Sequence, residues 1–452
     1  MTFTNQSLLW LSKLLKERYG HKFLLTKIEA NSIKMMLPGA TEYILFNNLQ
    51  QIFFQSDSNF PCESWNASTE NFLGPISDSL FAPSSDKLPT PLVSYKGSNA
   101  TCSYDILGLT YWMLTRLEEV DRKDLDEHDR FPATSSHAYH HGYLHRPIVD
   151  EWLDILGQII KRVWPSISLQ KHEFALKTSH DVDVPSLYGF KSWPKLLRTV
   201  AVDIVKRRRL NSLWLAPRVK LNSSEKLHPL DPANTFKWLL QVLEENELKS
   251  SFYFLSANTD KKRDADYVIE DPSICKLMQH IYERGHEIGL HPSYQTYLKP
   301  NMISDEFNRL KNLCHKLGIK QEVWGGRMHY LRWKTPTTLQ AWEDANLTYD
   351  STLGYADYAG FRCGTCFEYP AYNPITHEAL KLRIRPLIAM ECSVISPIYM
   401  NLGYSEKSLN QFLTLKNACR KVGGNFSLLW HNNHFMNKDD FNMFINIINK
   451  DS

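Results

Sequence analysis

Beyond about residue 171, the sequence alternates between short apolar runs typical of strands and longer segments with apolar residues at helical spacing. Strands are predicted at 174–184, 250–256, 286–293, 322–330, 387–394 and 426–435. Helices are predicted between them, at 235–247, 274–285, 304–318, 335–347 and 408–423. Such alternation indicates βαβ units and a parallel sheet, either open or closed as a barrel. This part of the chain is therefore predicted to have an α/β fold.

The first third of the chain has a different pattern. Short strands are predicted at 27–37, 42–48 and 51–56. A Pro- and Ser-rich stretch at 74–94 is expected to be a surface loop, and two helices are predicted at 104–119 and 146–164. A chain of 452 residues is long enough for two or three domains. We therefore predict a small α+β domain at 1–165, of unknown role, and a larger domain at 171–452.

Composition and charge exclude several classes of protein. The 52 Lys and Arg residues nearly balance the 49 Asp and Glu residues, so no nucleic-acid partner is expected. The first 20 residues have the pattern of an amphipathic helix rather than a signal peptide, and no apolar run reaches the roughly 18 residues of a membrane span. We therefore expect a cytoplasmic protein without a transmembrane segment. The basic run at 206–209 is interpreted as a solvated loop face, and the alternative is a phosphate-binding or peripheral membrane patch.

Titratable side chains come directly after the apolar runs of four of the predicted strands. They are Asp181, Asp183, His291, Arg327, His329 and His431. In a barrel of parallel strands, the carboxyl ends of the strands share one rim, and catalytic residues gather there. We therefore expect these side chains to form one site.

The pair Asp181 and Asp183 favours a metal ion. Because side chains alternate along a strand, both carboxylates point the same way and repel each other unless a cation lies near them. Asp183 as a ligand would leave Asp181 free to take a proton from a water that the metal activates. A capping pair at the strand end is the alternative. His286 lies about 16 Å before His291 along the strand, so it is interpreted as structural.

Four short motifs carry a resemblance to a known family. They are TSHDVDV at 178–184, GHEIGLHPS at 285–293, GGRMHY at 325–330 and LLWHNN at 428–433. In this order they resemble the motifs of the polysaccharide deacetylase superfamily, the carbohydrate esterases that remove N-acetyl groups from sugars. The resemblance covers roughly residues 174 to 435. It implies a distorted (β/α) barrel of about seven strands.

The resemblance also implies roles for five residues. It makes Asp181 the general base and Arg327 the partner that fixes this base. It makes Asp183 and His291 ligands of the metal, and His431 the general acid that protonates the leaving amine. These roles agree with the chemistry that the residue types allow.

The chain departs from the family pattern at two positions. The family has a second histidine four residues after the first, where this chain has Gln295, and it has a proline where this chain has His329. We hypothesise that His329 replaces the missing imidazole as third ligand; the alternative is that His329 contacts the substrate. One carboxylate and two imidazoles suit one divalent metal such as zinc, and also cobalt, nickel or manganese.

An aromatic loop after the arginine motif is interpreted as a sugar-binding surface. Its predicted substrate contacts are Tyr349, Asp350, Tyr355 and Arg362, because aromatic rings stack on pyranose faces and polar groups hold hydroxyls. Trp430, next to His431, is predicted to join them. The alternative is a loop that folds on its own aromatic side chains.

Two other clusters are interpreted as structural. The CGTC segment at 363–366 has no second CxxC partner, so a zinc site is not expected there. His137, His141 and His145 have helical spacing, but Gly142 weakens a helix and no carboxylate lies in register.

The predicted function is that of a metal-dependent hydrolase. It would remove N-acetyl groups from an amino sugar in a cell-surface polysaccharide precursor or glycan. One alternative is a metallo-amidase that acts on a non-sugar amide. Another is a catalytically inactive relative that binds carbohydrate.

Overall fold

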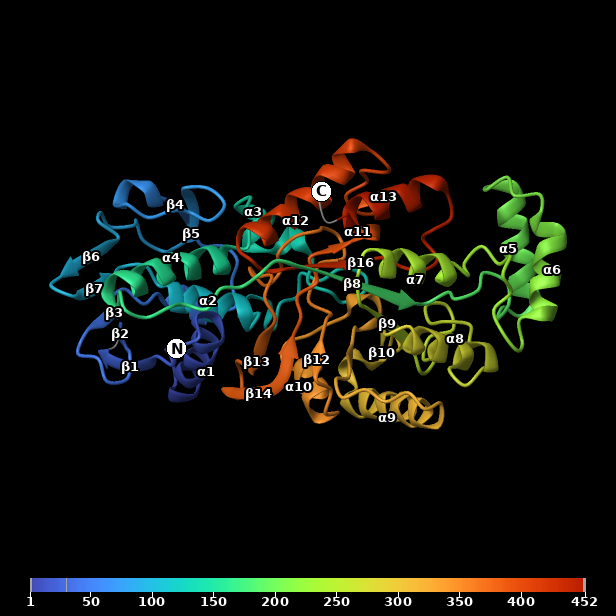
Figure 1. Ribbon diagram of the computed structural model, residues 1–452, viewed down its shortest axis with the longest axis horizontal. Coiled ribbons are helices and arrows are strands. Elements are labelled where there is room, and N and C mark those ends of the chain that lie inside the picture. The colour runs from blue at the N-terminus through green and yellow to red at the C-terminus, as the bar shows by residue number, and fades with distance from the viewer. Residues whose placement is uncertain (1, 30, 450–452) are drawn as a thin grey trace.

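A computed structural model describes residues 2–29 and 31–449 of the chain. The molecule is elongated, with the N-terminal third at one end and the helices α5 (Trp193–Val205) and α6 (Ser212–Asn222) at the other (Figure 1). Most strands belong to two sheets, one in each part of the chain. Within the described residues, no helix is both long enough and apolar enough to cross a membrane.

The N-terminal third contains a five-stranded sheet and a separate hairpin. In spatial order, the sheet contains β1 (Leu24–Glu29), β2 (Ser32–Met36), β3 (Tyr43–Phe46), β7 (Asn99–Cys102) and β6 (Val93–Lys96). The hairpin contains β4 (Cys62–Asn66) and β5 (Ser79–Pro83). The helices are α1 (Asn5–Tyr19), α2 (Ile106–Leu114), α3 (His137–His140) and α4 (Ile148–Val163). This region thus contains both helices and strands.

The rest of the chain forms a nine-stranded sheet. In spatial order it contains β13 (Tyr369–Asn373), β14 (Glu378–Ile384), β12 (Tyr349–Asp350), β11 (Gly325–Gly326), β10 (Glu287–His291), β9 (Ser250–Leu255), β8 (Ala175–Val182), β16 (Asn425–Leu429) and β15 (Ala389–Met390). All neighbouring pairs are parallel except β13 and β14. The predicted α/β fold with a parallel sheet is thereby confirmed.

Helices connect the strands of this sheet, and a last helix follows β16. Besides α5 and α6, they are α7 (Phe236–Glu245), α8 (Pro272–Glu283), α9 (Pro300–Lys316), α10 (Thr337–Asp344), α11 (Glu391–Ile395), α12 (Glu406–Lys421) and α13 (Lys438–Ile448). Prolines begin α8 and α9, where the missing N–H costs no hydrogen bond. Ser405 and Asn437 cap α12 and α13 through their side-chain oxygens, which accept bonds from free N–H groups of the first turn.

The chain between β14 and β15 forms hydrogen bonds with strands that lie apart in the sheet order. The Arg385 N–H donates to the carbonyl of Asp350, at the end of β12, over 2.9 Å. Three residues later, the Ile388 N–H donates to the carbonyl of Ser427 in β16 over 3.2 Å. This segment therefore connects β12 with β16. A barrel of about seven strands stays a prediction.

Four predicted strands differ from the structure. Residues 27–37 contain the end of β1 and all of β2, which pair antiparallel, instead of one strand. Residues 387–394 form the two-residue strand β15, and helix α11 begins at Glu391. Residues 51–56 contain a short 3-10 helix instead of a strand. Residues 322–330 pair only at Gly325 and Gly326. A Cβ on Gly326 would lie 1.8 Å from the Leu290 carbonyl oxygen, so glycine allows this close approach.

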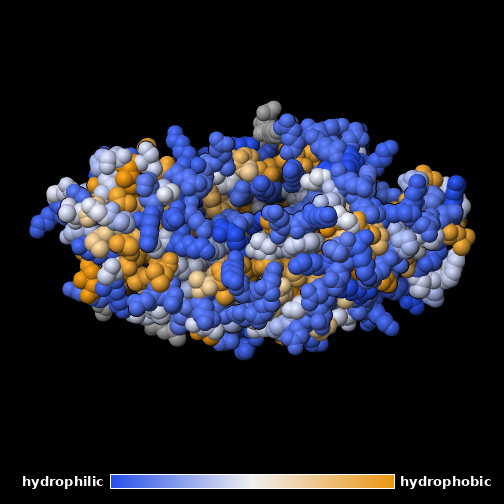
Figure 2. All heavy atoms as spheres, turned by 60° about the horizontal axis from the view of Figure 1, so that its bottom comes forward, coloured by the Kyte–Doolittle hydropathy of each residue, from blue (hydrophilic) through white to orange (hydrophobic). Residues whose placement is uncertain are grey.

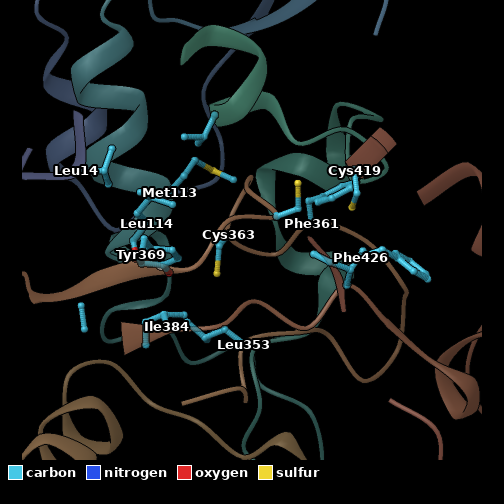
Figure 3. Packing of buried hydrophobic residues seen from close by; sticks show 14 of the residues in the cluster. Leu14, Met113, Leu114, Leu353, Phe361, Cys363, Tyr369, Ile384, Cys419 and Phe426 are labelled. Carbon is cyan, nitrogen blue, oxygen red and sulfur yellow. The ribbon is translucent and has the colours of Figure 1, made fainter. Parts of the chain in front are cut away.

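The hydrophobic core is continuous between the two parts of the chain. Leu14 of α1 and Leu114 of α2 belong to the same buried cluster as Tyr369 of β13 (Figure 3). The Tyr369 hydroxyl donates to the Leu114 carbonyl over 2.9 Å, and the Trp10 indole donates to the Pro370 carbonyl over 2.9 Å. The N-terminal region is thus packed against the edge of the nine-stranded sheet. Its division from the rest as a domain at 1–165, separate from 171–452, stays a prediction.

Candidate metal centre

The titratable side chains predicted for the strand ends converge on one pocket. Asp181 and Asp183 lie at the end of β8, and His291 ends β10. His329 and His431 follow β11 and β16. All five line a pocket of about 320 Å³. The parallel register of the strands is what brings these distant positions to one rim.

Asp183, His291 and His329 form a compact group of possible metal ligands. The Asp183 Oδ1 atom lies 3.3 Å from His291 Nε2 and 3.7 Å from His329 Nε2. One ligand atom from each residue lies within 4.8 Å of the other two. These separations suit three atoms around one divalent ion with metal–ligand distances near 2 Å.

Hydrogen bonds to the rest of the protein orient both imidazoles. His291 Nδ1 donates to the Arg327 carbonyl over 2.6 Å, so Nε2 carries the free lone pair. His329 Nδ1 lies 2.9 Å from Asp264 Oδ1. A carboxylate behind a ligand histidine fixes the ring and its tautomer, an arrangement typical of zinc sites. Both Nε2 atoms are therefore directed at the carboxylate of Asp183.

Two of the three possible ligand atoms are buried without a well-aligned hydrogen bond in the described part of the chain. Among the residues that the structure describes, neither Asp183 Oδ1 nor His291 Nε2 is part of a well-aligned hydrogen bond, although both atoms are buried. Burial of such atoms costs free energy unless an ion or another polar group compensates it. The three residues therefore fit a divalent metal ion.

Electrostatics also favour a cation at this position. Burial by itself would raise the pKa of Asp183, but His329 and His291 outweigh it and hold the pKa well below its usual range. Burial would lower the pKa of His329, yet Asp183 and Asp264 raise it to about 9. Two carboxylates thus make the centre of the group electronegative, and positive charge is stabilised there.

Asp181 is held by Arg327 rather than by the ligand group. The Arg327 guanidinium donates to Asp181 Oδ1 over 2.8 Å and to the Ser179 hydroxyl over 2.9 Å. It also donates to the Ser351 carbonyl over 2.9 Å. The second oxygen of Asp181 lies 3.8 Å from His291 Nε2. One oxygen of this carboxylate is therefore anchored, while the other faces the possible metal position.

His431 lies on the other side of Asp183. Its Nε2 atom is 3.7 Å from Asp183 Oδ2, and its Nδ1 atom is 2.5 Å from Glu391 Oε1. Burial would lower the pKa of His431, but Glu391, Asp183 and Asp181 raise it to about 10. A protonated imidazole with its Nδ1–H bound to a carboxylate can donate the Nε2 proton into the pocket.

Glu391 also belongs to a second group of possible ligands. This group contains Glu391, Cys392, His431 and His434, whose donor atoms lie within 4.8 Å of one another. The Cys392 sulfur is 3.4 Å from His434 Nδ1, which is 2.9 Å from Glu391 Oε1. Because Glu391 Oε1 already accepts from His431, the second group is less free to hold an ion than the first.

Other side chains of the pocket come from several parts of the chain. Tyr330 and Tyr399 contribute aromatic rings, and Arg263 contributes a cation. Arg130 comes from the N-terminal third, where Asp126 holds its guanidinium over 2.7 Å. The same guanidinium donates to the Tyr330 carbonyl over 2.8 Å. The N-terminal region thus contributes directly to the pocket.

The five predicted substrate contacts lie outside this pocket, in the protein interior. They are Tyr349, Asp350, Tyr355, Arg362 and Trp430, and all are buried. Asp350 accepts from the Trp333 indole over 2.9 Å, and the Trp430 indole donates to the His434 carbonyl over 3.1 Å. The structure therefore favours the alternative, in which this region packs on its own aromatic and polar side chains.

The remaining sequence clusters have structural environments. Cys363 and Cys366 are buried thiols in the described structure. His137 and His141 both contact the Phe60 carbonyl through Nε2, each over 3.0 Å. Gln295, at the position of the family's second histidine, lies outside both ligand groups, and its backbone N–H donates to Thr259.

Sequence reasoning missed two carboxylates of the site. Glu391 directly follows the apolar residues 387–390, so a strand-end signal was present, but it lies inside the strand predicted at 387–394. Asp264 lies in the polar loop between β9 and α8 and had no such signal. Arg130 had none either, because its contact joins positions that are 200 residues apart.

Comparisons with known proteins cover the two parts of the chain separately. Residues 3–165 match the model of a family of unknown function, DUF7033. No curated protein matches the chain. The match to the family model covers less than half of the sequence and gives the N-terminal region no activity.

Solved structures give matches of low similarity. A protein from Mycobacterium smegmatis described as a polysaccharide deacetylase shares 15% identity at a TM-score of 0.39, over 62% of this chain and 84% of that one. The allantoinase Puue shares 12% identity at a TM-score of 0.37, and the match covers 63% of this chain and 85% of that one. A protein from Pseudomonas aeruginosa PAO1 described as a polysaccharide deacetylase shares 12% identity at a TM-score of 0.37. This match covers 61% of this chain and 84% of that one. Because all three TM-scores are low, function is inferred below from this chain's own residues.

Proposed function

We propose that this protein is a metal-dependent hydrolase that removes N-acetyl groups from an amino sugar of a polysaccharide precursor or glycan. One observation carries the proposal. A ligand group of Asp183, His291 and His329 lies between an anchored carboxylate, Asp181, and the imidazole of His431, which Glu391 holds. The resemblance of the four motifs to those of polysaccharide deacetylases supports the choice of an N-acetylated sugar.

The three ligand residues suit zinc. One carboxylate and two imidazoles leave a fourth position open, as hydrolytic zinc sites require. A divalent ion held there would lower the pKa of water and polarise the amide carbonyl. The role of His329 as third ligand is supported by its Nε2 atom, which lies 3.7 Å from Asp183 Oδ1, and by Asp264 behind its ring.

Asp181 acts as the general base in this proposal. Its free oxygen faces the ligand group and accepts the proton of the attacking water. Arg327 holds the other oxygen over 2.8 Å, so the carboxylate keeps one orientation during the reaction. Arg327 is itself buried and donates to Ser351, which fixes the guanidinium. Its role is to position the base.

His431 acts as the general acid. Amide hydrolysis requires a proton on the leaving nitrogen, because an amide anion is a poor leaving group. The pKa of His431, raised to about 10 by Glu391 and the two aspartates against the effect of burial, keeps the imidazole protonated at neutral pH. Glu391 is the positioning residue, since it holds Nδ1 and leaves Nε2 free to donate.

The substrate-binding surface is proposed to be the pocket itself. Tyr330 and Tyr399 offer rings for stacking on a pyranose, and Arg130 and Arg263 offer cations for hydroxyl or anionic groups. A pocket of about 320 Å³ has room for one sugar residue or a short part of a glycan. The N-terminal region, through Arg130, helps to shape this surface.

Metal content and acetate release test the proposal. Purified wild type is expected to hold about one equivalent of metal and to release acetate from N-acetylhexosamine conjugates, whereas Asp183→Asn loses both. Activity on a cyclic imide or ureide, without acetate release from sugars, would favour the metallo-amidase. Sugar binding without turnover by a metal-loaded protein would favour the inactive relative. Retention of stoichiometric metal by Asp183→Asn would contradict the ligand assignment.

A further inference from the structure

The helices α5 and α6 form a hairpin that projects from one end of the molecule (Figure 1). A small hydrophobic cluster holds the two helices together. It contains Leu196 and Val200 of α5 and Leu215, Ala216 and Val219 of α6. This cluster is separate from the main core, so the hairpin has its own packed interior. Further apolar side chains on these helices are thus not needed for contact between them.

Both helices nevertheless expose large apolar side chains. On α5, Trp193 is 50% exposed, Leu197 68% and Val205 78%. On α6, Trp214 is 56% exposed and Leu221 69%. A helix whose outer face contacts only water usually has polar side chains on that face. Apolar side chains on both the buried and the outer face are therefore atypical. Figure 2 shows apolar side chains mixed with hydrophilic ones at this end of the molecule.

Apolar side chains recur along one side of α6. Leu213, Trp214 and Leu221 are exposed, and Pro217 lies between them at helical spacing. The buried side chain of Val219 points to the opposite side of the helix. Contiguous exposed apolar surface of this kind marks a contact with a partner or a membrane.

Basic residues surround the apolar side chains. The segment 193–222 contains eight Lys and Arg residues and one acid, Asp203. Asp203 is buried and pairs with Arg207 over 2.8 Å. Lys206 and Arg208 are exposed at the turn between the helices. The partner of this surface must therefore be both apolar and negatively charged.

We propose that the α5–α6 hairpin docks on the surface of a membrane that contains anionic lipids. Helices that carry Trp and Leu among Lys and Arg lie in the membrane interface, with the rings and leucines at the acyl boundary and the cations at the headgroups. The hairpin has both kinds of side chain on an outer surface. The positive charges of Lys206 and Arg208 are complementary to the negative phosphates of such a surface.

A basic cavity extends from the hairpin to the metal centre. Lys195 and Arg198 of α5 line it, together with Lys261 and Lys262 of the loop after β9. Its volume is about 420 Å³, and it shares Asp183 with the pocket of the metal centre. Lys195 pairs with Asp266, so Arg198, Lys261 and Lys262 are the cations that the cavity offers to a phosphate-bearing lipid at the membrane. This extension rests on the proposed function, whereas docking of the hairpin does not.

Vesicle flotation with the full chain tests the docking. Wild type is expected to float with phosphatidylcholine vesicles that contain phosphatidylglycerol and to bind phosphatidylcholine alone more weakly. Added salt is expected to weaken binding to the anionic vesicles, because it screens exposed charges. Absence of binding to anionic vesicles at low salt would overturn the proposal.

Two variants separate the apolar and charged contributions. Leu213→Ser with Trp214→Ser is expected to weaken vesicle binding at least about tenfold, because each side chain loses its burial in lipid. Lys206→Gln with Arg208→Gln is expected to weaken binding to anionic vesicles about fivefold for each charge removed. Ile375→Ser is the matched control, since Ile375 is also exposed, at 52%, but lies outside the hairpin. Equal binding by wild type and the Leu213 and Trp214 variant would contradict the proposal.

Two further measurements distinguish membrane docking from loss of the fold and from dimerisation. Metal content and thermal unfolding of each variant report whether the fold and the metal centre persist, so that loss of vesicle binding is assigned to the hairpin. Light scattering reports the oligomeric state. If wild type dimerises but does not bind vesicles, and the Leu213 and Trp214 variant does not dimerise, the partner of the hairpin is a second copy of this chain and not a membrane. Failure of the deacetylase assay would leave the docking result unchanged.

Discussion

Asp264 and His329 form a buried carboxylate–imidazole pair, with Oδ1 2.9 Å from Nδ1. The pair directs His329 Nε2 towards Asp183, at 3.7 Å from its Oδ1 atom. Asp264 is itself fixed, because it accepts hydrogen bonds from the backbone N–H groups of Thr259 and Tyr294 over 2.7 and 2.8 Å. His329 therefore has the support expected of a metal ligand.

Substitution of Asp264 tests this support. Asp264→Asn is expected to lower metal affinity about 10- to 100-fold, because the amide no longer fixes the tautomer and ring of His329. His329→Ala is expected to lose the metal. Competition with a chelator measures both. Asp344→Asn is the matched control, since Asp344 is exposed at the end of α10 and lines neither the pocket nor the basic cavity. If His329→Ala and Asp264→Asn bind the metal as tightly as wild type does, His329 is not a ligand. The alternative, in which His329 contacts the substrate, would then be favoured.

The pair of Glu391 and His431 predicts a pH effect. Glu391 helps to raise the pKa of His431 to about 10 against the effect of burial, and the acid is active only while protonated. Activity is therefore lost as pH rises through this pKa. Glu391→Gln is expected to move the alkaline limb of kcat/KM to lower pH, by roughly 1–3 units. Glu406→Gln on α12 is the control, and an unchanged alkaline limb in Glu391→Gln would contradict the role of His431 as acid.

Cobalt substitution decides which ligand group takes the ion. The group of Asp183, His291 and His329 has no sulfur, so cobalt bound there gives no thiolate charge-transfer absorption in the near ultraviolet. Cobalt bound by Cys392 and His434 gives that absorption. We expect wild type and Cys392→Ser to have the same cobalt spectrum, without the thiolate band. A band that disappears in Cys392→Ser would assign the ion to the second group.

Asp181 is predicted to be needed for turnover but not for metal binding. Asp181→Asn is expected to retain the metal and to lower kcat about 10²- to 10⁴-fold, the usual contribution of a general base. His291→Ala is expected to lose the metal as well as activity. Elemental analysis beside steady-state kinetics separates the two. An Asp181→Asn protein without metal would show that Asp181 is a ligand and not the base.

Much of the site could be predicted because its residues follow strands. Asp183, His291 and His431 each end an apolar run, and a parallel sheet brings such ends to one rim whatever the lengths of the connecting helices. Glu391 carried the same signal but stood within a run whose composition is typical of one uninterrupted strand. In the structure a helix begins at this residue, which turns its carboxylate towards His431.

The rest depended on contacts that sequence spacing does not encode. Arg130 lines the pocket through a hydrogen bond across 200 residues, and Asp264 lies in a loop whose composition resembles any polar loop. Tyr349 was assigned to the substrate because aromatic rings serve sugar binding and core packing equally well. Its hydroxyl lies 3.0 Å from that of Tyr253, inside the sheet, and only the tertiary structure makes that distinction.

Arg362, a predicted substrate contact, is expected to contribute to stability instead. Its guanidinium donates to both Glu119 oxygens, over 2.9 and 2.6 Å, and both side chains are buried. Burial would raise the pKa of Glu119, but Arg362 and Arg116 lower it. Arg362→Ala is expected to lower the free energy of unfolding by about 3 kcal/mol, because one partner of a buried charge pair is removed while Arg116 remains. The urea midpoint measures this loss.

The matched control is Arg383→Ala, because Arg383 pairs with Glu17 and Glu368 near the surface. This variant is expected to lose at most about 1 kcal/mol, since solvent screens the pair. KM is expected to stay the same in both variants, as neither side chain lines the pocket. If Arg362→Ala has unchanged stability and a raised KM, Arg362 is a substrate contact as first predicted. Loss of a structural ion pair between Glu119 and Arg362 cannot produce that combination.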